Sequence, residues 1–327
     1  MFILVISNTE VATIPGITVA GKTPELIKYT PIADAEFLFY SKPLSIDAIP
    51  VTPAGHPTPG IITKASRLLT NFPIIVVRSG TILKPKIPYV EISDIPGNNI
   101  LEKQAIPNLN SVLERSEIFG QGISDDFSEI YIGESIPGGT TTAQAILNAL
   151  GYDSKVSSAS NENPIDLKMK VVNKALERVG RKSIDWYVAL KELGDPMMAF
   201  IVGFSQGFKG KIYLAGGTQM LAVAALLKEL GRKPEKILTT KYVVNDKTAT
   251  FVKTSREIGV EYYSADLDFS NSKYNGLKDY ENGIVKEGVG AGGSVYIAEK
   301  YGINVSDIVK KVEEIYGNLV GKKSIFG

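Results

Sequence analysis

A glutamate in a glycine-rich setting is the first residue whose surroundings suggest chemistry. Glu287 lies in Lys286-Glu-Gly-Val-Gly-Ala-Gly-Gly-Ser294, which leads into a predicted helix. The four glycines leave little side-chain bulk around the carboxylate, and burial raises a carboxyl pKa toward the range of a general base. The structural alternative is that Glu287 interacts with the helix N-terminus or pairs with a lysine. Composition alone favours neither the general base nor the structural partner.

Two further glycine-rich segments join a predicted strand to a predicted helix. They are Gly133-Glu-Ser-Ile-Pro-Gly-Gly-Thr-Thr-Thr142 and Leu214-Ala-Gly-Gly-Thr-Gln-Met220. The backbone N–H groups that begin a helix form a site for anions such as phosphate. The first segment lacks the lysine of a Walker A loop and also lacks G-x-G-x-x-G. A tight turn with a threonine N-cap explains the first segment as well, and a close strand–helix contact explains the second.

Four other polar residues each have a structural and a functional interpretation. Lys168 and Lys170 lie on a helical pattern, where most lysines are solvated. His56 lies in Ala54-Gly-His-Pro-Thr-Pro59, a loop whose prolines order its backbone and suit either a structural hydrogen bond or a pocket wall. Asp246 fits a turn better than a ribose contact.

The composition excludes several classes of site. The 327 residues contain no cysteine and one histidine, which excludes disulfides, thiolate zinc sites, iron–sulfur clusters, cysteine nucleophiles and histidine-rich metal sites. We therefore expect neither a metal nor a cofactor. Lys plus Arg is 36 and Asp plus Glu is 35, a net charge of +1 that argues against nucleic acid or an anionic membrane as partner. The N-terminus MFILVISNTE lacks a basic n-region, and no apolar stretch is long enough to span a bilayer, so we expect a cytoplasmic protein.

Short apolar runs alternate with helical patterns along most of the chain. This alternation predicts an α/β fold, a doubly wound, mostly parallel sheet with helices on both faces. Residues 15–59 look irregular, and 304–319 form an amphipathic pattern. We expect a core over 1–303, with 304–327 as part of a small helical subdomain. The expected strands are 2–6, 36–40, 74–77, 129–132, 211–214, 237–244 and 260–263, and the clearest helices are 141–150, 166–179, 196–208 and 218–230.

In order along the chain, these segments resemble the nicotinate-nucleotide–dimethylbenzimidazole phosphoribosyltransferase family, in its archaeal-type branch. The segment 133–142 resembles the family's G-E-x-x-x-G-N-T-T, and Pro59-Gly-Ile-Ile-Thr63 resembles Y-P-x-x-V-T. Leu214-Ala-Gly-Gly-Thr resembles V-L-D-G-F, and Glu287-Gly-Val-Gly-Ala resembles the E-G-T-G-A that holds the catalytic glutamate. The family's asparagine is Gly139 here, and its S-H-x-S-x-E-P-G-H stretch has no clear counterpart.

The resemblance implies transfer of the phosphoribosyl group of nicotinate mononucleotide to a benzimidazole-type base, giving an α-ribotide and nicotinate. It makes Glu287 the general base, with Gly288 and Gly290 in its loop. Phosphate and ribose would contact Gly138, Gly139, Thr140, Thr141, Lys168, Gly216, Gly217 and Thr218. The base would contact Glu134, Ser135, His56 and Pro59.

Two other functions remain open from the sequence. A nucleosidase or hydrolase would use the same loops and Glu287 with water as acceptor, and a sensor would bind the nucleotide without turnover. The expected partners are small molecules and a second copy of the chain, since two-fold homodimers are the commonest assembly.

Overall fold

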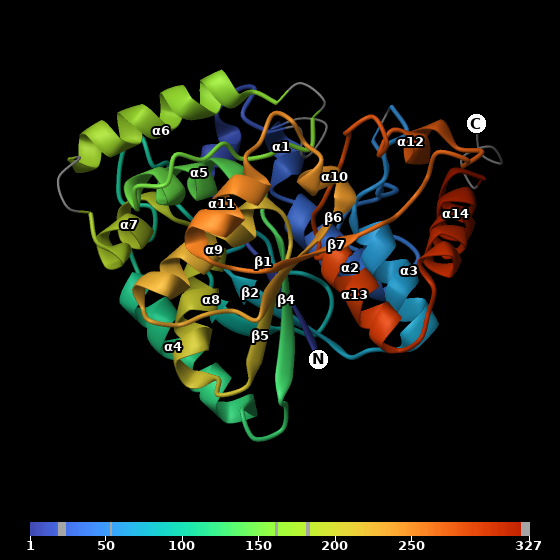
Figure 1. The fold of residues 1–327 in the computed structure, drawn as a ribbon, viewed down its shortest axis with the longest axis horizontal. Coiled ribbons are helices and arrows are strands. Elements are labelled where there is room, and N and C mark those ends of the chain that lie inside the picture. The colour runs from blue at the N-terminus through green and yellow to red at the C-terminus, as the bar shows by residue number, and fades with distance from the viewer. Residues whose placement is uncertain (19–23, 53, 161–162, 181–183, 322–327) are drawn as a thin grey trace.

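The computed structural model describes residues 1–18, 24–52, 54–160, 163–180 and 184–321. Its strands are β1 (Phe2–Ile6), β2 (Ile74–Ser79), β3 (Val90–Ser93), β4 (Glu129–Ser135), β5 (Lys211–Ala215), β6 (Lys236–Thr240) and β7 (Tyr262–Ala265). Its helices are η1 (Glu10–Thr13), α1 (Pro24–Ile27), α2 (Thr30–Phe39), α3 (Gly60–Thr70), α4 (Leu109–Ile123), α5 (Gly139–Ala149), α6 (Ile165–Val179), α7 (Trp186–Leu193), α8 (Pro196–Gly207), α9 (Thr218–Glu229), α10 (Lys241–Val244), α11 (Phe251–Ile258), α12 (Asn275–Lys278), α13 (Ala291–Lys300) and α14 (Val305–Gly321). The predicted α/β class is confirmed (Figure 1).

The seven strands form one sheet in the order β3-β2-β1-β4-β5-β6-β7. Every neighbouring pair is parallel, so the sheet is more uniform than the mostly parallel one expected. The strand order reverses direction between β1 and β4, where Ile6 pairs with Ser135. In doubly wound sheets, ligands bind outside the carboxyl ends of the strands at such a reversal. The fold therefore directs attention to the loops after β1 and β4.

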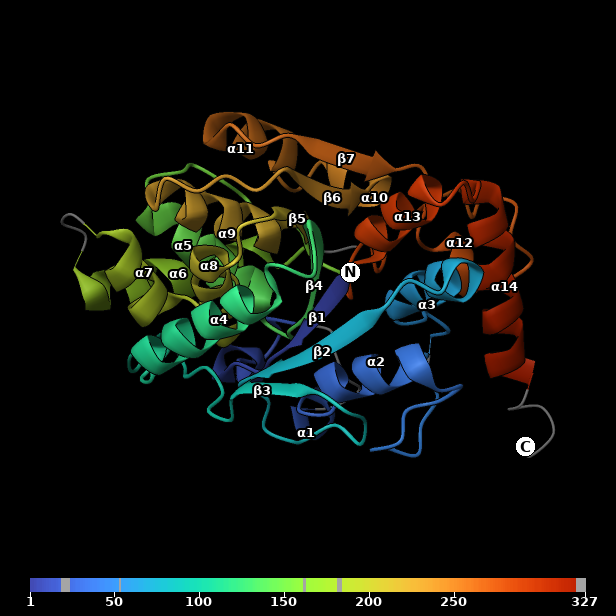
Figure 2. The same cartoon turned by 90° about the horizontal axis from the view of Figure 1, so that it is seen from below.

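Alternating side chains of the strands bury both faces of the sheet. Ile3 and Val5 of β1 face the layer of α4, α5, α8 and α9, whereas Phe2, Leu4 and Ile6 face α2 and α13. Figure 2 shows these two helical layers on opposite sides of the sheet. Because both faces are covered, the strands are apolar runs rather than alternating patterns.

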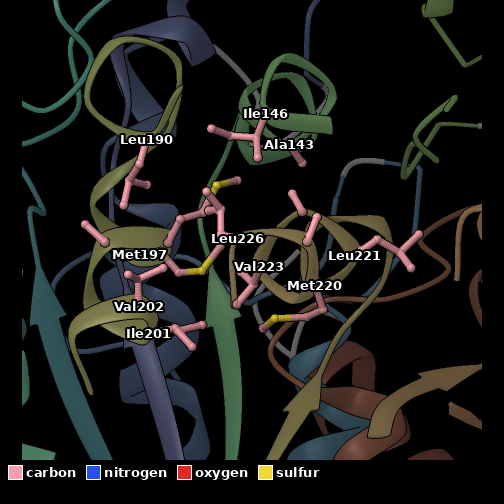
Figure 3. Packing of buried hydrophobic residues seen from close by; sticks show 14 of the residues in the cluster. Ala143, Ile146, Leu190, Met197, Ile201, Val202, Met220, Leu221, Val223 and Leu226 are labelled. Atoms are coloured by element: carbon pink, nitrogen blue, oxygen red, sulfur yellow. The ribbon is translucent and has the colours of Figure 1, made fainter. Parts of the chain in front are cut away.

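The larger core lies between the sheet and α5, α7, α8 and α9. Ala143 and Ile146 of α5, Met197 of α8 and Met220 of α9 point into a common interior (Figure 3). Helices α8 and α9 are almost entirely buried. Helix α8 leads to β5, and α9 follows the glycine loop at the carboxyl end of β5. This packing fixes where α5 and α9 begin, and hence where their glycine loops lie.

The N-terminal region contains the clearest error of the sequence-based prediction. The expected strand at residues 36–40 is wrong, because residues 36–39 belong to α2, whose first turn contains Pro31, and Tyr40 is its C-cap. Ile32, Ala35 and Leu38 recur at helical spacing and pack on the sheet face opposite α8. Residues 241–244 form α10 rather than continuing a strand, and β3 is an edge strand that the sequence patterns do not predict.

Glu36 of α2 organises the loop that follows this helix. Its buried carboxylate accepts hydrogen bonds from the amides of Leu44 (2.6 Å), Ser45 (2.7 Å) and Lys86 (2.8 Å). We expect Glu36→Gln to lower the free energy of unfolding by about 2 kcal/mol, because the glutamine amide places a donor among donors. Urea unfolding measures this loss, and Glu114→Gln, exposed on α4, is the matched control expected to change little.

Helix α14 packs beside α3 and α13 around a separate apolar cluster that includes Ile308, Val312 and Ile315. This fits a small helical unit at that side of the sheet, and the division at residue 303 stays a prediction. Residues 322–327 of the expected subdomain lie outside the described residues. Within the described ranges, no helix is long and apolar enough to cross a membrane.

Candidate functional site

Glu287 lies in the loop before α13, at the carboxyl edge of the sheet. Its carboxylate accepts hydrogen bonds from the amides of Gly292 (3.2 Å) and Gly288 (3.3 Å). Desolvation by burial raises the pKa of Glu287 to about 7, although these backbone donors oppose the rise. Both sequence-based interpretations therefore describe part of the environment: the carboxylate contacts the helix N-terminus, and it also has a pKa suited to proton transfer near neutral pH.

The backbone around Glu287 is strained. Among the described residues, four non-glycine residues have positive φ, and three of them are Val285 (74°), Lys286 (54°) and Val289 (55°). A β-branched residue in this region is a true outlier, and each such residue costs about 1–3 kcal/mol. Strain of this kind persists where the surroundings impose it and clusters at functional sites. The conformation thus supports a functional role for this loop independently of its sequence motif.

Glu134, near the end of β4, forms a coupled pair with Glu287. The two segments touch: the Val289 amide donates to the Glu134 carbonyl at 2.8 Å, and Gly290 lies against Gly133. Burial, followed by the charge of Glu287, raises the pKa of Glu134 well above its ordinary value. Burial thus raises the pKa of both carboxyls. Buried carboxyls with raised pKa values that lie close together are candidate acid and base residues.

Two more buried carboxyls adjoin this pair, and the sequence analysis assigns neither to the site. Asp34 of α2 accepts hydrogen bonds from the hydroxyls of Ser135 (2.7 Å) and Thr58 (2.6 Å). Asp195 caps α8 and accepts from the Thr142 hydroxyl at 2.6 Å. Burial raises the pKa of each to about 6, against the effect of these donors. Asp195-Pro196 gives only a capping signal in the sequence, and Asp34 lies in a segment whose pattern looks irregular.

The first glycine loop is tightly packed at the start of α5. Gly138 is the helix N-cap with φ 81°, and a Cβ there would approach the Ala12 amide nitrogen to 2.9 Å. A Cβ at Gly139 would meet the Gln219 side chain at 2.1 Å. The expected threonine N-cap is wrong, because no side chain caps this helix. Thr140 is half-buried, and the buried Thr141 hydroxyl finds no hydrogen-bond partner within the described part of the chain.

The second glycine loop lies beside Glu287. A Cβ at Gly217 would be 3.7 Å from Glu287 Cβ, and one at Gly216 would be 2.9 Å from Met220 Cγ and 3.8 Å from Glu134 Oε1. The loops after β4 and β5 and the loop before α13 therefore converge. The Thr218 hydroxyl accepts a hydrogen bond from the Ser157 amide at 3.1 Å, so it ties the start of α9 to the segment before α6.

Lys168 is fully buried, so the solvated interpretation is wrong. Its ammonium donates to the Ser157 carbonyl (3.0 Å) and to Asn163 Oδ1 (3.3 Å). Desolvation lowers its pKa to about 8. Lys170 is exposed on the same helix, as expected for a solvated lysine. The phosphate contact of Lys168 stays a prediction.

The loop from His56 to Pro59 divides between two neighbours. Pro59 lies against Gly288, where an added Cβ would be 2.8 Å from Pro59 Cγ. His56 instead reaches Asp279 at 2.8 Å, which favours its structural interpretation. Pro59, Gly288 and Gly290 thus lie in or against the Glu287 loop, whereas the Ser135 hydroxyl contacts Asp34. Among the residues that the structure describes, no three His, Cys, Asp or Glu side chains are arranged to hold a metal ion.

Comparison with known proteins shows close relatives over the whole length. A UPF0284 protein of Pyrococcus furiosus is 57% identical over 98% of this chain and 99% of its own, and one of Pyrococcus abyssi is 55% identical over 99% of each. The chain belongs to the UPF0284 family. A more distant member, from Sulfolobus acidocaldarius, is 47% identical over 98% of this chain and 95% of its own. No family model matches the chain.

Two solved structures from Thermus thermophilus share the fold at 14% sequence identity. One, described as nicotinate-nucleotide-dimethylbenzimidazole phosphoribosyltransferase, superposes with a TM-score of 0.60 over 97% of this chain and 82% of its own. The other, described as CobT, gives 0.61 over 98% and 85%. The resemblance stated from the sequence motifs is thereby confirmed for the fold.

Proposed function

We propose that the chain is a phosphoribosyltransferase that moves the phosphoribosyl group of nicotinate mononucleotide to a benzimidazole-type base. The observation that supports this most directly is the Glu134–Glu287 pair. A carboxylate with a pKa of about 7 lies on a strained loop at the carboxyl edge of the sheet, near a second buried carboxyl whose pKa burial also raises. The fold shared with the Thermus thermophilus structures adds support for this substrate class.

The proposed reaction forms one bond and breaks one at the ribose C1 carbon. A ring nitrogen of the base attacks C1, the bond from C1 to the nicotinate nitrogen breaks, and that nitrogen takes the electron pair. The pyridinium nitrogen is already cationic, so nicotinate leaves without protonation. Attack from the opposite face inverts the β configuration to α. Glu287 takes the proton from the other ring nitrogen of the base, a general-base contribution of typically about 100- to 10,000-fold.

The other residues bind and orient in this proposal. Glu134 orients the base through a hydrogen bond, and Ser135, Pro59 and the loop that begins at His56 form walls of the pocket. The Gly138 amide, the hydroxyls of Thr140 and Thr141, and Lys168 bind phosphate or ribose. Gly139 belongs to the same binding loop, and its amide donates to the Ile136 carbonyl at 3.2 Å. Gly216, Gly217 and Thr218 line the nucleotide side. Holding the two reactants together supplies much of the acceleration.

The proposal also includes a cytoplasmic location and a two-fold symmetric homodimer. For the dimer, the support is the resemblance and the prevalence of two-fold assemblies. Neither property enters the chemistry above.

A product assay tests the proposal. The purified chain is incubated with nicotinate mononucleotide, with and without dimethylbenzimidazole, at about pH 8, which is above the pKa of about 7 of Glu287. The products are separated by chromatography with mass detection. We expect an α-ribotide and nicotinate in equal amounts, formed only when the base is present. A panel of benzimidazole, its hydroxylated form and adenine then ranks acceptors, whose discrimination by a pocket is about 1–3 kcal/mol per small group.

Two outcomes contradict the proposal. Nicotinate and ribose phosphate released without the base would identify a hydrolase. A thermal shift with the nucleotide and no turnover with any acceptor would identify a nucleotide-binding protein.

A further inference from the structure

Lys286, which directly precedes Glu287, attaches the strained loop to other segments of the protein. Lys286 Nζ lies 2.9 Å from Asp246 Oδ2 and donates to the carbonyls of Ser158 (2.9 Å) and Ser160 (3.4 Å). The side chains of Lys286 and Asp246 are only 6% and 4% exposed. The ammonium has three donors, and these three oxygens match that number.

The backbone of the same loop is held on both sides of Lys286. The Lys286 carbonyl accepts a hydrogen bond from the Thr240 hydroxyl at 2.6 Å, and the Val285 amide donates to the Ala159 carbonyl at 2.9 Å. The side chain of Lys286 therefore reaches to the segment 157–160 and to Asp246 while its carbonyl is fixed to the end of β6. Glu287 follows directly, so its direction depends on these contacts.

Further hydrogen bonds hold both carboxylate oxygens of Asp246 in place. It accepts hydrogen bonds from the Ser157 hydroxyl (2.5 Å) and from the amide and hydroxyl of Thr248 (2.9 and 2.7 Å). The sequence-based interpretation of Asp246 as a turn residue is correct, because its carbonyl accepts from the Ala249 amide. In addition, its Oδ2 atom forms the ion pair with Lys286. The other buried cation nearby, Lys168, bonds to the Ser157 carbonyl rather than to Asp246.

We infer that Lys286 and Asp246 form a positioning pair that holds the Glu287 loop in its left-handed conformation and aims the Glu287 carboxylate. A buried ion pair is weak evidence for stability, because replacing both partners by neutral groups is often neutral or stabilising. Lys286, however, has a strained backbone and contacts both Asp246 and the carbonyls of Ser158 and Ser160. These contacts restrict the loop to one conformation. The inference rests on the proposed function only in assigning Glu287 as the base.

The test separates positioning from stability with three variants: K286M, D246N and the double variant K286M/D246N. Each single variant leaves one buried charge unpaired and is expected to unfold at lower temperature. The double variant removes both charges, while the asparagine side chain keeps the shape of the aspartate it replaces. It is expected to recover most of the thermal stability, whereas kcat stays about 10- to 100-fold below wild type and KM for the nucleotide changes less than about threefold.

A second readout does not depend on activity. Hydrogen exchange of the peptide covering 285–292 is expected to accelerate at least about tenfold in the stable double variant, with no change in a peptide covering β1. The matched control is the exposed pair Lys253–Asp153, at 3.0 Å with side chains 48% and 96% exposed. K253M/D153N is expected to leave both kcat and exchange in 285–292 unchanged.

Recovery of kcat together with stability in K286M/D246N would overturn the inference and make the pair purely structural. Unchanged exchange in 285–292 would overturn it as well. A wild-type chain without transferase activity would instead contradict the proposed function, and the exchange experiment would still decide whether the pair holds the loop.

Discussion

Glu287→Gln is expected to lower turnover by at least about 100-fold while leaving nucleotide affinity nearly unchanged. Glutamine keeps the size of the side chain and can still accept from the amides of Gly292 and Gly288, but it cannot take a proton. The loss therefore falls on kcat rather than on binding, as expected when a group acts only in the transition state. Steady-state kinetics with nicotinate mononucleotide and dimethylbenzimidazole, plus calorimetric titration of the nucleotide, measure the two effects separately.

Glu114→Gln is the matched control, because it makes the same chemical change on an exposed face of α4. Its kinetics should equal those of the wild type. Normal turnover in Glu287→Gln would remove Glu287 from the mechanism. An equal loss of turnover and nucleotide affinity would make it a binding residue instead.

The same substitution is expected to make the protein more stable above neutral pH. The pKa of Glu287 is about 7 in the folded chain, against an ordinary value of 4.5. Between these values the unfolded chain has lost the proton that the folded chain keeps, so wild-type stability falls as pH rises from about 4.5 to 7. Glu287→Gln escapes this loss, and its advantage should grow from near zero below about pH 4.5 to on the order of 3 kcal/mol above about pH 7.

Urea unfolding of both proteins at about pH 4.5, 6 and 8 measures this difference across the window. The difference between wild type and Glu114→Gln should stay flat over the same range. An advantage for Glu287→Gln that shrinks as pH rises would mean that the folded protein favours the ionised carboxylate. In that case Glu287 would be an ordinary helix-terminus partner rather than a base.

Together, lower turnover and higher stability in Glu287→Gln would show that the group needed for proton transfer destabilises the folded protein. A buried carboxylate that must ionise destabilises the fold, and the left-handed residues Val285, Lys286 and Val289 add backbone strain to the same loop. Stabilisation upon replacing one ionisable side chain by a neutral one, coupled to loss of turnover, is the usual sign of such a site.

The sequence predicts the sheet and the glycine loops because these depend on local signals. Apolar runs mark strands covered on both faces, and glycines mark close approaches such as Gly290 against Gly133. Glu287 can be singled out because its glycines are its sequence neighbours. The convergence of three loops follows from the parallel sheet, in which loops after β4 and β5 meet at one edge.

What the sequence does not show depends on tertiary burial. Asp34 and Asp195 lie 161 positions apart in sequence, yet both act on the charge environment of Glu134. Lys168 has the sequence pattern of a solvated lysine because its helix is amphipathic, and in the fold its ammonium is enclosed where it meets the Ser157 carbonyl and Asn163 Oδ1. The helix α2 escapes prediction because turn-forming residues surround it, whereas its stability depends on packing against the sheet.

The internal position of β1 in the sheet has a consequence for synthesis of the chain. Its two ladders join residues that are 72 and 129 positions apart, since Phe2 pairs with Ile74 and with Tyr131. At about 5–20 residues per second, the ribosome needs roughly 6–25 s to deliver the second partner. During that interval the apolar segment FILVI is an unpaired strand edge, the kind of surface that aggregates or recruits chaperones. Among the strands that the structure describes, β1 thus waits longest for its second neighbour in the sheet.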